Sequence, residues 1–497
     1  MSKTTITYKD VAVGAQEGAT VSATGATAES SPALLADGAS PGKVITLEHD
    51  RWALDGSFDR YYEQSTIAFW SAEISGDDGA LAAEPAITIA FDQQYSSMGI
   101  SFVFDDAAGD YVSLLNIKWY QGDTLIADQD FMPDHARYFC SKRVESYDKL
   151  IITLKKTYPA RRRAKLNRIV FGIIRHFEMT ELRSASITNE MDESAIELPI
   201  STFNWMLSSA SDVDYMFQLK QPVEVRNNDR LLGVYYISGS SRQSVSVYGI
   251  ECDDAIGVLS ETPFAGGAYL SGVSAKTLLT ALAEPFSVEY ADDVEDTTLT
   301  GVLLEQTARE AIQQVIFAWG VCLATDGGAV IRVFNPGTEP TAIPQNRTFS
   351  GASVDTDAIV TKVSVTAHTY TAASNGNIKI GGAAYNDETT VYMVSNPNIT
   401  ASDRENAKAI TDATLVSAAI GQVVANRVYA HYAKRNTAAA RIVYGGERLG
   451  ERISIYTPWG TLSTGILSKM EITLSNTVVY KAEVTGHELC RCAGHGI

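Results

Sequence analysis

The sequence predicts a mainly β, multidomain protein: a β-sandwich jelly roll, then an α+β region, then a β-barrel-like domain. Its 497 residues are too many for a single hydrophobic core. Short runs rich in β-branched and aromatic residues, separated by turn residues, fill the first third of the chain and return at its end. Helical periodicity is confined to a few stretches between them.

Composition narrows the class of protein. The chain is 45% hydrophobic and 20% charged with a mean hydropathy of −0.04, as in globular proteins. Its net charge of −19 argues against nucleic-acid recognition, which needs clustered lysine and arginine. No run of 18 apolar residues predicts a membrane span, and the N-terminus lacks the apolar centre of a signal peptide. Five cysteines, odd in number and mostly scattered, favour free thiols in a reduced compartment.

The N-terminal region is expected to be a strand followed by a flexible arm, over residues 1–42. Residues 14–42 are rich in alanine, serine, threonine and glycine and show little periodicity. Residues 43–175 then give the pattern of a β-sandwich. Its clearest predicted strands are residues 86–91, 100–104, 116–120 and 150–155.

A basic run closes the predicted sandwich. It comprises Arg161, Arg162, Arg163, Lys165 and Arg168. Such a run is compatible with a localisation signal or a nucleic-acid patch. In an acidic protein we interpret it as a solvated strand end or an inter-subunit contact.

Residues 176–260 are predicted to form a β-domain with a meander. The stretch 221–237 is predicted to be a hairpin turning at Asn227-Asn228-Asp229, and residues 244–250 add a third strand. Asp253 and Asp254 are expected to cap a short helix at 255–259.

Residues 261–345 are predicted to be α+β, and residues 346–497 a helix with a barrel-like domain. Ser274 is expected to cap a helix over 275–283. Thr307 and Glu310 match a capping box before a helix that Gly320 ends. A third helix is expected over 414–434. The closing strands are predicted at residues 452–457, 464–474 and 478–484, with the last two joined by a turn at 475–477.

The sequence contains few signs of catalysis. It has no phosphate-binding loop, no nucleophile elbow and no metalloprotease motif. Aspartate pairs occur at 77–78, 105–106, 253–254 and 292–293. Adjacent carboxylates on a strand point to opposite faces, and in turns they are usually solvated. We therefore expect that the protein is not an enzyme and needs no cofactor.

Two weaker binding sites are considered. Trp70, Trp119 and Tyr120 are candidates for a sugar-stacking platform, although aromatic residues in a sandwich more often fill its core. The C-terminal tail has the ligand types that zinc accepts, in His487, Cys490, Cys492 and His495. The Cys-x-Cys spacing is tight for one ion, so no metal is expected there.

Four groups of residues carry a family resemblance. They are SITNEMDESAIELPISTF at 186–203, the meander at 221–259, the helix at 307–319 with the following GVCLATDGG, and VYGGERLGERISIYTP at 443–458 with GILSKMEITL at 465–474. With these, residues 177–497 resemble baseplate hub, or tail-tip, proteins of tailed bacteriophages and prophages. TLEHDRWALDG at 46–56, IKWY at 117–120 and YPARR at 158–162 resemble a discoidin-like, galactose-binding-type module ahead of such hubs.

The resemblance implies a structural role at the tail tip of a virion or a tail-like particle, assembled in the bacterial cytoplasm. It implies a homotrimer that joins the tail tube to the spike. The implied partners are the distal tail protein, the tape measure protein and a spike or receptor-binding protein, with a host-surface glycan for the N-terminal module. Two alternatives stay open: a carbohydrate-binding adhesin or receptor-binding protein of the tail, and a cell-wall glycan hydrolase with a binding module.

Overall fold

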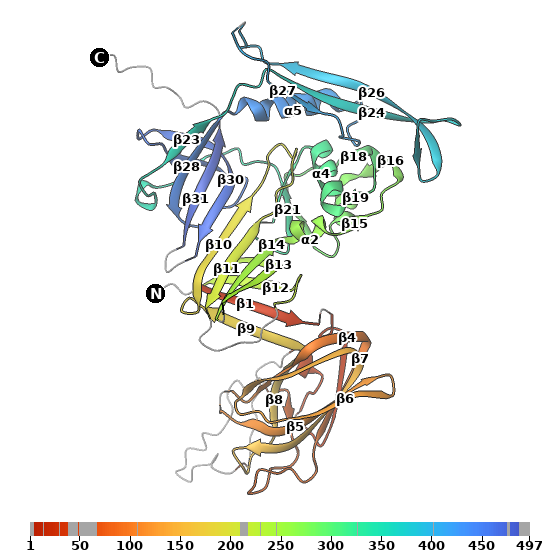
Figure 1. The fold of residues 1–497 in the computed structure, drawn as a ribbon, viewed down its shortest axis with the longest axis vertical. Coiled ribbons are helices and arrows are strands. Elements are labelled where there is room, and N and C mark those ends of the chain that lie inside the picture. The colour runs from red at the N-terminus through yellow and green to blue at the C-terminus, as the bar shows by residue number, and fades with distance from the viewer. Residues whose placement is uncertain are drawn as a thin grey trace. The chain divides into compact units, whose positions relative to one another are not determined.

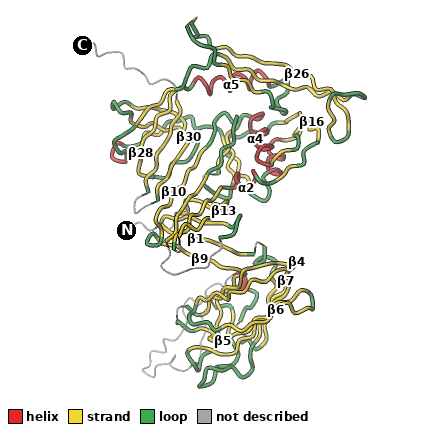
Figure 2. The backbone as a smooth tube through the Cα atoms, viewed as in Figure 1, coloured by secondary structure: helices red, strands yellow, loops and turns green. Residues whose placement is uncertain are grey.

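The computed structural model describes twelve stretches of the chain. They are residues 4–12, 14–28, 30–37, 48, 67–106, 108–208, 217–228, 230–244, 246–325, 327–400, 402–474 and 478–486. Strands make up 54% of the structure and helices 10%, which confirms the mainly β prediction (Figure 2). No helix of the described residues is long and apolar enough to cross a membrane.

The chain folds into two compact units. One comprises residues 7–176, and the other combines the N-terminal residues up to Ile6 with residues from Phe177 onward. The chain therefore passes from one unit to the other twice, within β1 (Thr4–Val11) and within β9 (Gly172–Glu178) (Figure 1). The five-part division expected from the sequence stays a prediction.

The N-terminal unit is built on one seven-stranded sheet. Its strand order is β3-β8-β4-β7-β5-β6, with β2 paired to β4. The elements are β2 (Ala19–Thr24), α1 (Leu34–Asp37), β3 (Phe69–Trp70), β4 (Ala86–Phe104), β5 (Tyr111–Gln121), β6 (Thr124–Phe131), β7 (Arg137–Tyr158) and β8 (Lys165–Val170). The strands predicted at residues 86–91 and 100–104 are the two halves of β4.

Both halves of β4 pack into the same core. Its pairing with β7 is irregular between Ala90 and Gly99. Ile87 before this irregularity and Phe102 after it belong to one buried cluster. The long strands therefore pack around a shared core, as strands of a β-sandwich are expected to do.

Residues 14–37 are not an arm, contrary to the prediction. Ala19–Thr24 pair antiparallel with Phe91–Ala86 of β4. Leu35 of α1 is fully buried in the core of the unit. The small side chains that suggested a linker lie on the edge strand of the sheet, where alternate residues stay exposed. The remaining arm residues, 38–42, lie outside the described residues.

The second unit contains a long sheet that joins distant parts of the sequence. Its order runs β23-β28-β31-β30-β10-β11-β14-β13-β12, with β29 on β30 and β22 on β29. The N-terminal strands of this path are β10 (Leu182–Glu190), β11 (Thr202–Ser208), β12 (Pro222–Asn227), β13 (Arg230–Ser244) and β14 (Val247–Asp253). The C-terminal strands are β22 (Thr341–Ala342), β23 (Ser353–Thr356), β28 (Asn436–Val443), β29 (Arg452–Tyr456), β30 (Leu462–Thr473) and β31 (Val479–Gly486).

Pairing of β10 with β30 connects the predicted β-domain to the predicted barrel-like domain. Ile187 is opposite Ile472, and Asn189 is opposite Met470. The predicted boundaries at 260 and 346 thus separate strands that share hydrogen bonds. The hairpin of β12 and β13 and the third strand β14 are confirmed.

The middle of the unit packs helices against short strands. Its elements are α2 (Ala255–Ser260), β15 (Pro263–Phe264), β16 (Ala268–Ser274), α3 (Ala275–Leu282), β17 (Val288–Tyr290), β18 (Thr298–Leu303), β19 (Gln306–Thr307), α4 (Ala308–Trp319), β20 (Cys322–Ala324), β21 (Ile331–Phe334) and the 3₁₀ helix η1 (Gln345–Arg347). The Thr307–Glu310 capping box is present, and Gly320 ends α4 in the left-handed region at φ 91°. Asp254 and Ser274 cap α2 and α3 as predicted.

A four-stranded sheet, β25-β26-β24-β27, covers α5 (Gly421–Ala433). Its strands are β24 (Lys362–Ala372), β25 (Ile378–Ile380), β26 (Ala383–Ser395) and β27 (Ala407–Ile410). The third helix begins at Gly421, seven residues later than predicted. Residues 414–417 form a turn and a single bridge to His368 instead, where Val416 O accepts from His368 N and Thr414 Oγ1 donates to Val302 O.

Candidate functional site

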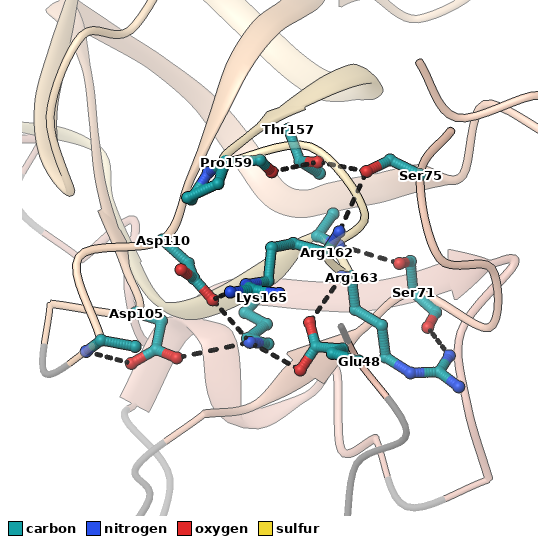
Figure 3. A network of polar contacts seen from close by, with 12 residues as sticks. Glu48, Ser71, Ser75, Asp105, Asp110, Thr157, Pro159, Arg162, Arg163 and Lys165 are labelled. Atoms are coloured by element: carbon teal, nitrogen blue, oxygen red, sulfur yellow. Dashed lines mark hydrogen bonds and ion pairs between the residues drawn. The ribbon is translucent and has the colours of Figure 1, made fainter. Parts of the chain in front are cut away.

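A buried ionic cluster lies in the N-terminal unit, around Lys165 (Figure 3). Lys165 Nζ lies 2.9 Å from Glu48 Oε2, 2.8 Å from Asp110 Oδ2 and 3.6 Å from Asp105 Oδ2. The side chains of Lys165 and Glu48 are fully buried. Nζ also lies 5.2 Å from the centre of a Trp70 ring. One lysine therefore contacts three carboxylates, two from the turn between Asp105 and Asp110 and one from Glu48.

The arginines before Lys165 extend this cluster. Arg162 Nε lies 3.5 Å from Asp110 Oδ2. Arg163 donates from its backbone N to Glu48 Oε1 at 2.7 Å and from Nη1 to the carbonyl oxygen of Ser71 at 2.5 Å. Figure 3 shows Arg162, Arg163 and Lys165 converging on Glu48 and Asp110.

The interpretation of the basic run as a solvated strand end is wrong for its centre. Lys165 is 1% exposed and Arg162 is 9% exposed. Only Arg161, which pairs with Asp77 at 2.6 Å, and Arg168 are exposed. A charge that is buried away from water must be paired with an opposite charge. The sequence around Lys165 does not show which carboxylates supply that pairing. Its position between Ala164 and Leu166 on a strand was the available signal.

The three aromatic candidates do not form a sugar-stacking surface. Trp70 is 2% exposed and Trp119 is fully buried in the core of the unit. A buried indole cannot offer its face to a sugar ring. Tyr120 is half-buried, and Lys149 Nζ lies 4.9 Å from its ring centre. Trp70 and Trp119 are therefore core residues, and the candidate platform of Trp70, Trp119 and Tyr120 loses both of its tryptophans.

The aspartate pairs lie in different environments. Asp105 is buried in the ionic cluster, whereas a solvated turn was expected. Asp254 is buried between elements: it accepts from Gly257 N, Ser201 N and the hydroxyl of Thr325, the last at 2.6 Å. Burial raises its pKa to about 6. These hydrogen bonds connect the start of β11, the first turn of α2 and the residue after β20, so Asp254 has a structural role.

The cysteines of the described residues are free thiols, as predicted. Cys140, Cys252 and Cys322 are buried and unbonded to one another. Burial raises the pKa of Cys322 to about 12, so it remains protonated at neutral pH. His487, Cys490, Cys492 and His495 lie outside the described residues. Among the residues that the structure describes, no group of three potential ligands could hold a metal ion.

No family model and no curated protein sequence matches the chain. Several solved structures are similar to it. A tail protein from Neisseria meningitidis MC58 aligns with a TM-score of 0.46 and 13% identity, covering 63% of this chain and 93% of that one. The 43 kDa tail protein of prophage MuSo2 from Shewanella oneidensis gives 0.46 and 11%, covering 63% and 96%. Prophage tail protein gp18 from Listeria monocytogenes EGD-e gives 0.42 and 12%, covering 63% and 92%.

Proposed function

We propose that this chain is the structural baseplate hub, or tail-tip component, of a tailed phage or a prophage-derived tail-like particle. In this proposal it is a non-enzymatic homotrimer that joins the end of the tail tube to the spike or receptor-binding apparatus. Its partners are the distal tail protein, the tape measure protein and the spike. The N-terminal unit is an additional module of each subunit.

One observation carries the proposal. The stretches that resemble hub proteins, although widely separated in sequence, all fold into the second unit. Residues 186–203 include most of β10 and the start of β11, and residues 221–259 form the meander. Residues 443–458 and 465–474 include β29 and most of β30, which pairs with β10. The residues carrying the resemblance thus form neighbouring strands of one sheet, with the capped helix α4 packed in the same unit.

Exposed apolar side chains support assembly with other subunits. Trp459 and Leu462, at the turn between β29 and β30, are 60% and 47% exposed. Exposed tryptophan is enriched where proteins meet. We expect this turn to contact another subunit in the particle.

The proposal is tested with the full-length protein and with particles. Light scattering is expected to give a trimer, and electron microscopy with a specific antibody is expected to place the protein at the tail tip. Trp459→Ser is expected to leave the melting temperature unchanged but to reduce incorporation into particles. A stable monomer that is missing from purified tails contradicts the proposal.

The carbohydrate-binding alternative loses its main support with the burial of Trp70 and Trp119. A glycan hydrolase remains distinguishable by assay. Turnover of cell-wall glycan that disappears on replacing one carboxylate would favour the hydrolase over the hub.

A further inference from the structure

Among the described residues, the four-stranded sheet that covers α5 has an open edge on each side (Figure 1). On one side, β26 pairs with β24 from Tyr385 to Ser395, but β25 covers only residues 383–385 of its opposite edge. On the other side, β27 is the last strand and pairs with β24 alone. Most of the β26 edge and all of the β27 edge can therefore accept a further strand.

The backbone of β26 points away from the sheet at every second residue. Asp387 shows the direction, because its N–H donates to Asn377 Oδ1 at 2.8 Å and its carbonyl oxygen accepts from Asn377 Nδ2 at 3.4 Å. Asn377 precedes β25, on the side of β26 away from β24. The pairing with β24 is regular, so Thr389, Val391 and Met393 also direct their N–H and C=O groups to that side. Within the described part of the chain these groups have no hydrogen-bond partner.

No charged side chain protects the β26 edge. Residues 389–395 read TTVYMVS, in a chain that is 20% charged. Val391 and Met393 are 58% and 55% exposed. Proteins usually guard an open edge with charges, proline or a bulge, so an uncharged edge with exposed apolar side chains is suited to association. Each copy of the chain has a net charge of −19, and a neutral surface is where two copies repel each other least.

The backbone of β27 offers a matching edge. Thr361, just before β24, donates from its N–H to Asn406 O at 2.9 Å and accepts from Asn406 N at 3.0 Å. Asn406 therefore points toward β24, and the alternation along the strand directs the backbone groups of Ala407 and Ala409 outward. Both alanines are exposed. The outward N–H and C=O groups of β27 are thus accessible to another strand.

The side chains of the two edges are complementary in size. Ser364 of β24 has Met393 of β26 as its partner on one side and Ala409 of β27 on the other, so these three side chains lie on one face of the sheet. Val391 and Ala407, each two residues away along its strand, lie on the same face. One edge thus presents two large apolar side chains, and the other presents two methyl groups that leave room for them.

We propose that the β26 edge of one copy of this chain pairs antiparallel with the β27 edge of the next copy, with Met393 opposite Ala407 and Val391 opposite Ala409. Within one sheet β26 and β27 run in opposite directions, so sheets placed side by side in the same orientation bring the two edges together antiparallel. Each copy provides one edge of each kind, so a closed ring leaves neither edge open. The number of copies in that ring rests on the proposed homotrimer, whereas the pairing itself does not.

The test is disulfide formation between copies of the full-length protein. The double variant Met393→Cys with Ala407→Cys places two thiols opposite each other, where paired Cα atoms about 5.5 Å apart suit a disulfide. Within one chain β24 separates the same two positions by about 10 Å, which is too far for a disulfide. Mild oxidation is expected to shift the variant from single chains to linked copies on a denaturing gel without reductant. Cys490 and Cys492 are replaced by serine in every variant, so that they cannot form links.

Two further pairs control for side-chain direction and for folding. Met393→Cys with Lys408→Cys moves one thiol to the other face, because Lys408 Nζ lies 5.5 Å from the ring centre of Tyr432 on α5. This pair is expected to remain as single chains. Val391→Cys with Ala409→Cys is the second pair of the proposed register and is expected to link copies as the first pair does. Circular dichroism of the reduced variants checks that each one is folded.

Three results overturn the inference without touching the proposed hub. One is a trimer by light scattering in which neither outer-face pair links copies. Another is equal linking by the pair that contains Lys408→Cys. The third is linking by Met393→Cys alone as efficient as that of the double variant, which would mean that two β26 edges pair with each other. A protein that stays monomeric overturns both this inference and the proposed trimer.

Discussion

Lys165 Nζ lies 2.9 Å from Glu48 Oε2, with both side chains fully buried beneath the surface of the N-terminal unit. Two further carboxylates, those of Asp105 and Asp110, share the same ammonium group. Charges taken out of water are tolerated only when they are paired and hydrogen-bonded. Lys165 therefore ties Glu48 to β8 and to the turn before β5.

Replacing Lys165 by methionine is expected to destabilise the N-terminal unit by about 3–5 kcal/mol, because three carboxylates then lose their shared cation. Calorimetry of the full-length protein measures the loss as a lower melting temperature. Lys118→Met is the matched control. The Lys118 side chain is 40% exposed and lies 3.8 Å from Asp128, so the loss expected there is about 1 kcal/mol at most. Equal shifts in the two variants would contradict a special role for the cluster.

A fragment of residues 7–176 is expected to fold alone, whereas residues 43–175 are not. The shorter fragment lacks β2, which pairs along β4, and α1, whose Leu35 is buried in the core. Removing an edge strand exposes both its backbone partners and the apolar face beneath it. Circular dichroism melting of both fragments checks this. A cooperative melt of residues 43–175 at the same temperature would show that β2 and α1 are dispensable.

Trp119→Ala is expected to cost about 3–5 kcal/mol of stability, because a fully buried indole leaves a large cavity. Tyr120→Ala, the next residue on the strand and half-buried, is expected to cost much less. Urea unfolding of the two variants measures the difference. If Trp119→Ala keeps wild-type stability and loses binding on a glycan array, the indole is a ligand-binding group and its burial is misassigned.

Asp254 is expected to make stability depend on pH between about 4 and 6. Its pKa is raised by burial from 3.8 to about 6. The folded state therefore binds the proton of Asp254 more tightly than the unfolded state does. The stability that this proton contributes is fully present below pH 3.8 and is lost as the pH rises to about 6. The loss amounts to about 3 kcal/mol. Urea unfolding is expected to show that the free energy of unfolding of Asp254→Asn rises relative to that of the wild type as the pH increases across this window.

Asp296 provides the opposite sign as a control. Its pKa is lowered by a hydrogen bond from the Ser274 hydroxyl and another from Lys276 N. Its contribution is present above the ordinary carboxyl pKa and is lost as the pH falls. Asp296→Asn is therefore expected to be less stable than the wild type at neutral pH, and the difference in stability is expected to shrink in acid. Parallel pH profiles for the two variants would refute at least one of the two assignments.

The sequence by itself determined the features that depend on neighbours along the chain. The capping box of Thr307 and Glu310 and the end of α4 at Gly320 were predicted to the residue. The hairpin of β12 and β13 turns where predicted, and Asn228 has the positive φ of 52° that asparagine tolerates. These signals are complete within a few residues, because the groups that cap a helix or form a turn are local.

Only the tertiary structure decided which distant segments meet. Nothing near residues 19–24 indicates that they pair with β4, and nothing near Ile187 indicates its partner Ile472. From the sequence, Lys165 belongs to a basic run that is expected to be solvated. In the structure it is buried beside Glu48, Asp105 and Asp110. Strand pairing and burial are set by side chains far along the chain, so the same residue type is stable on a surface or in a core according to its neighbours.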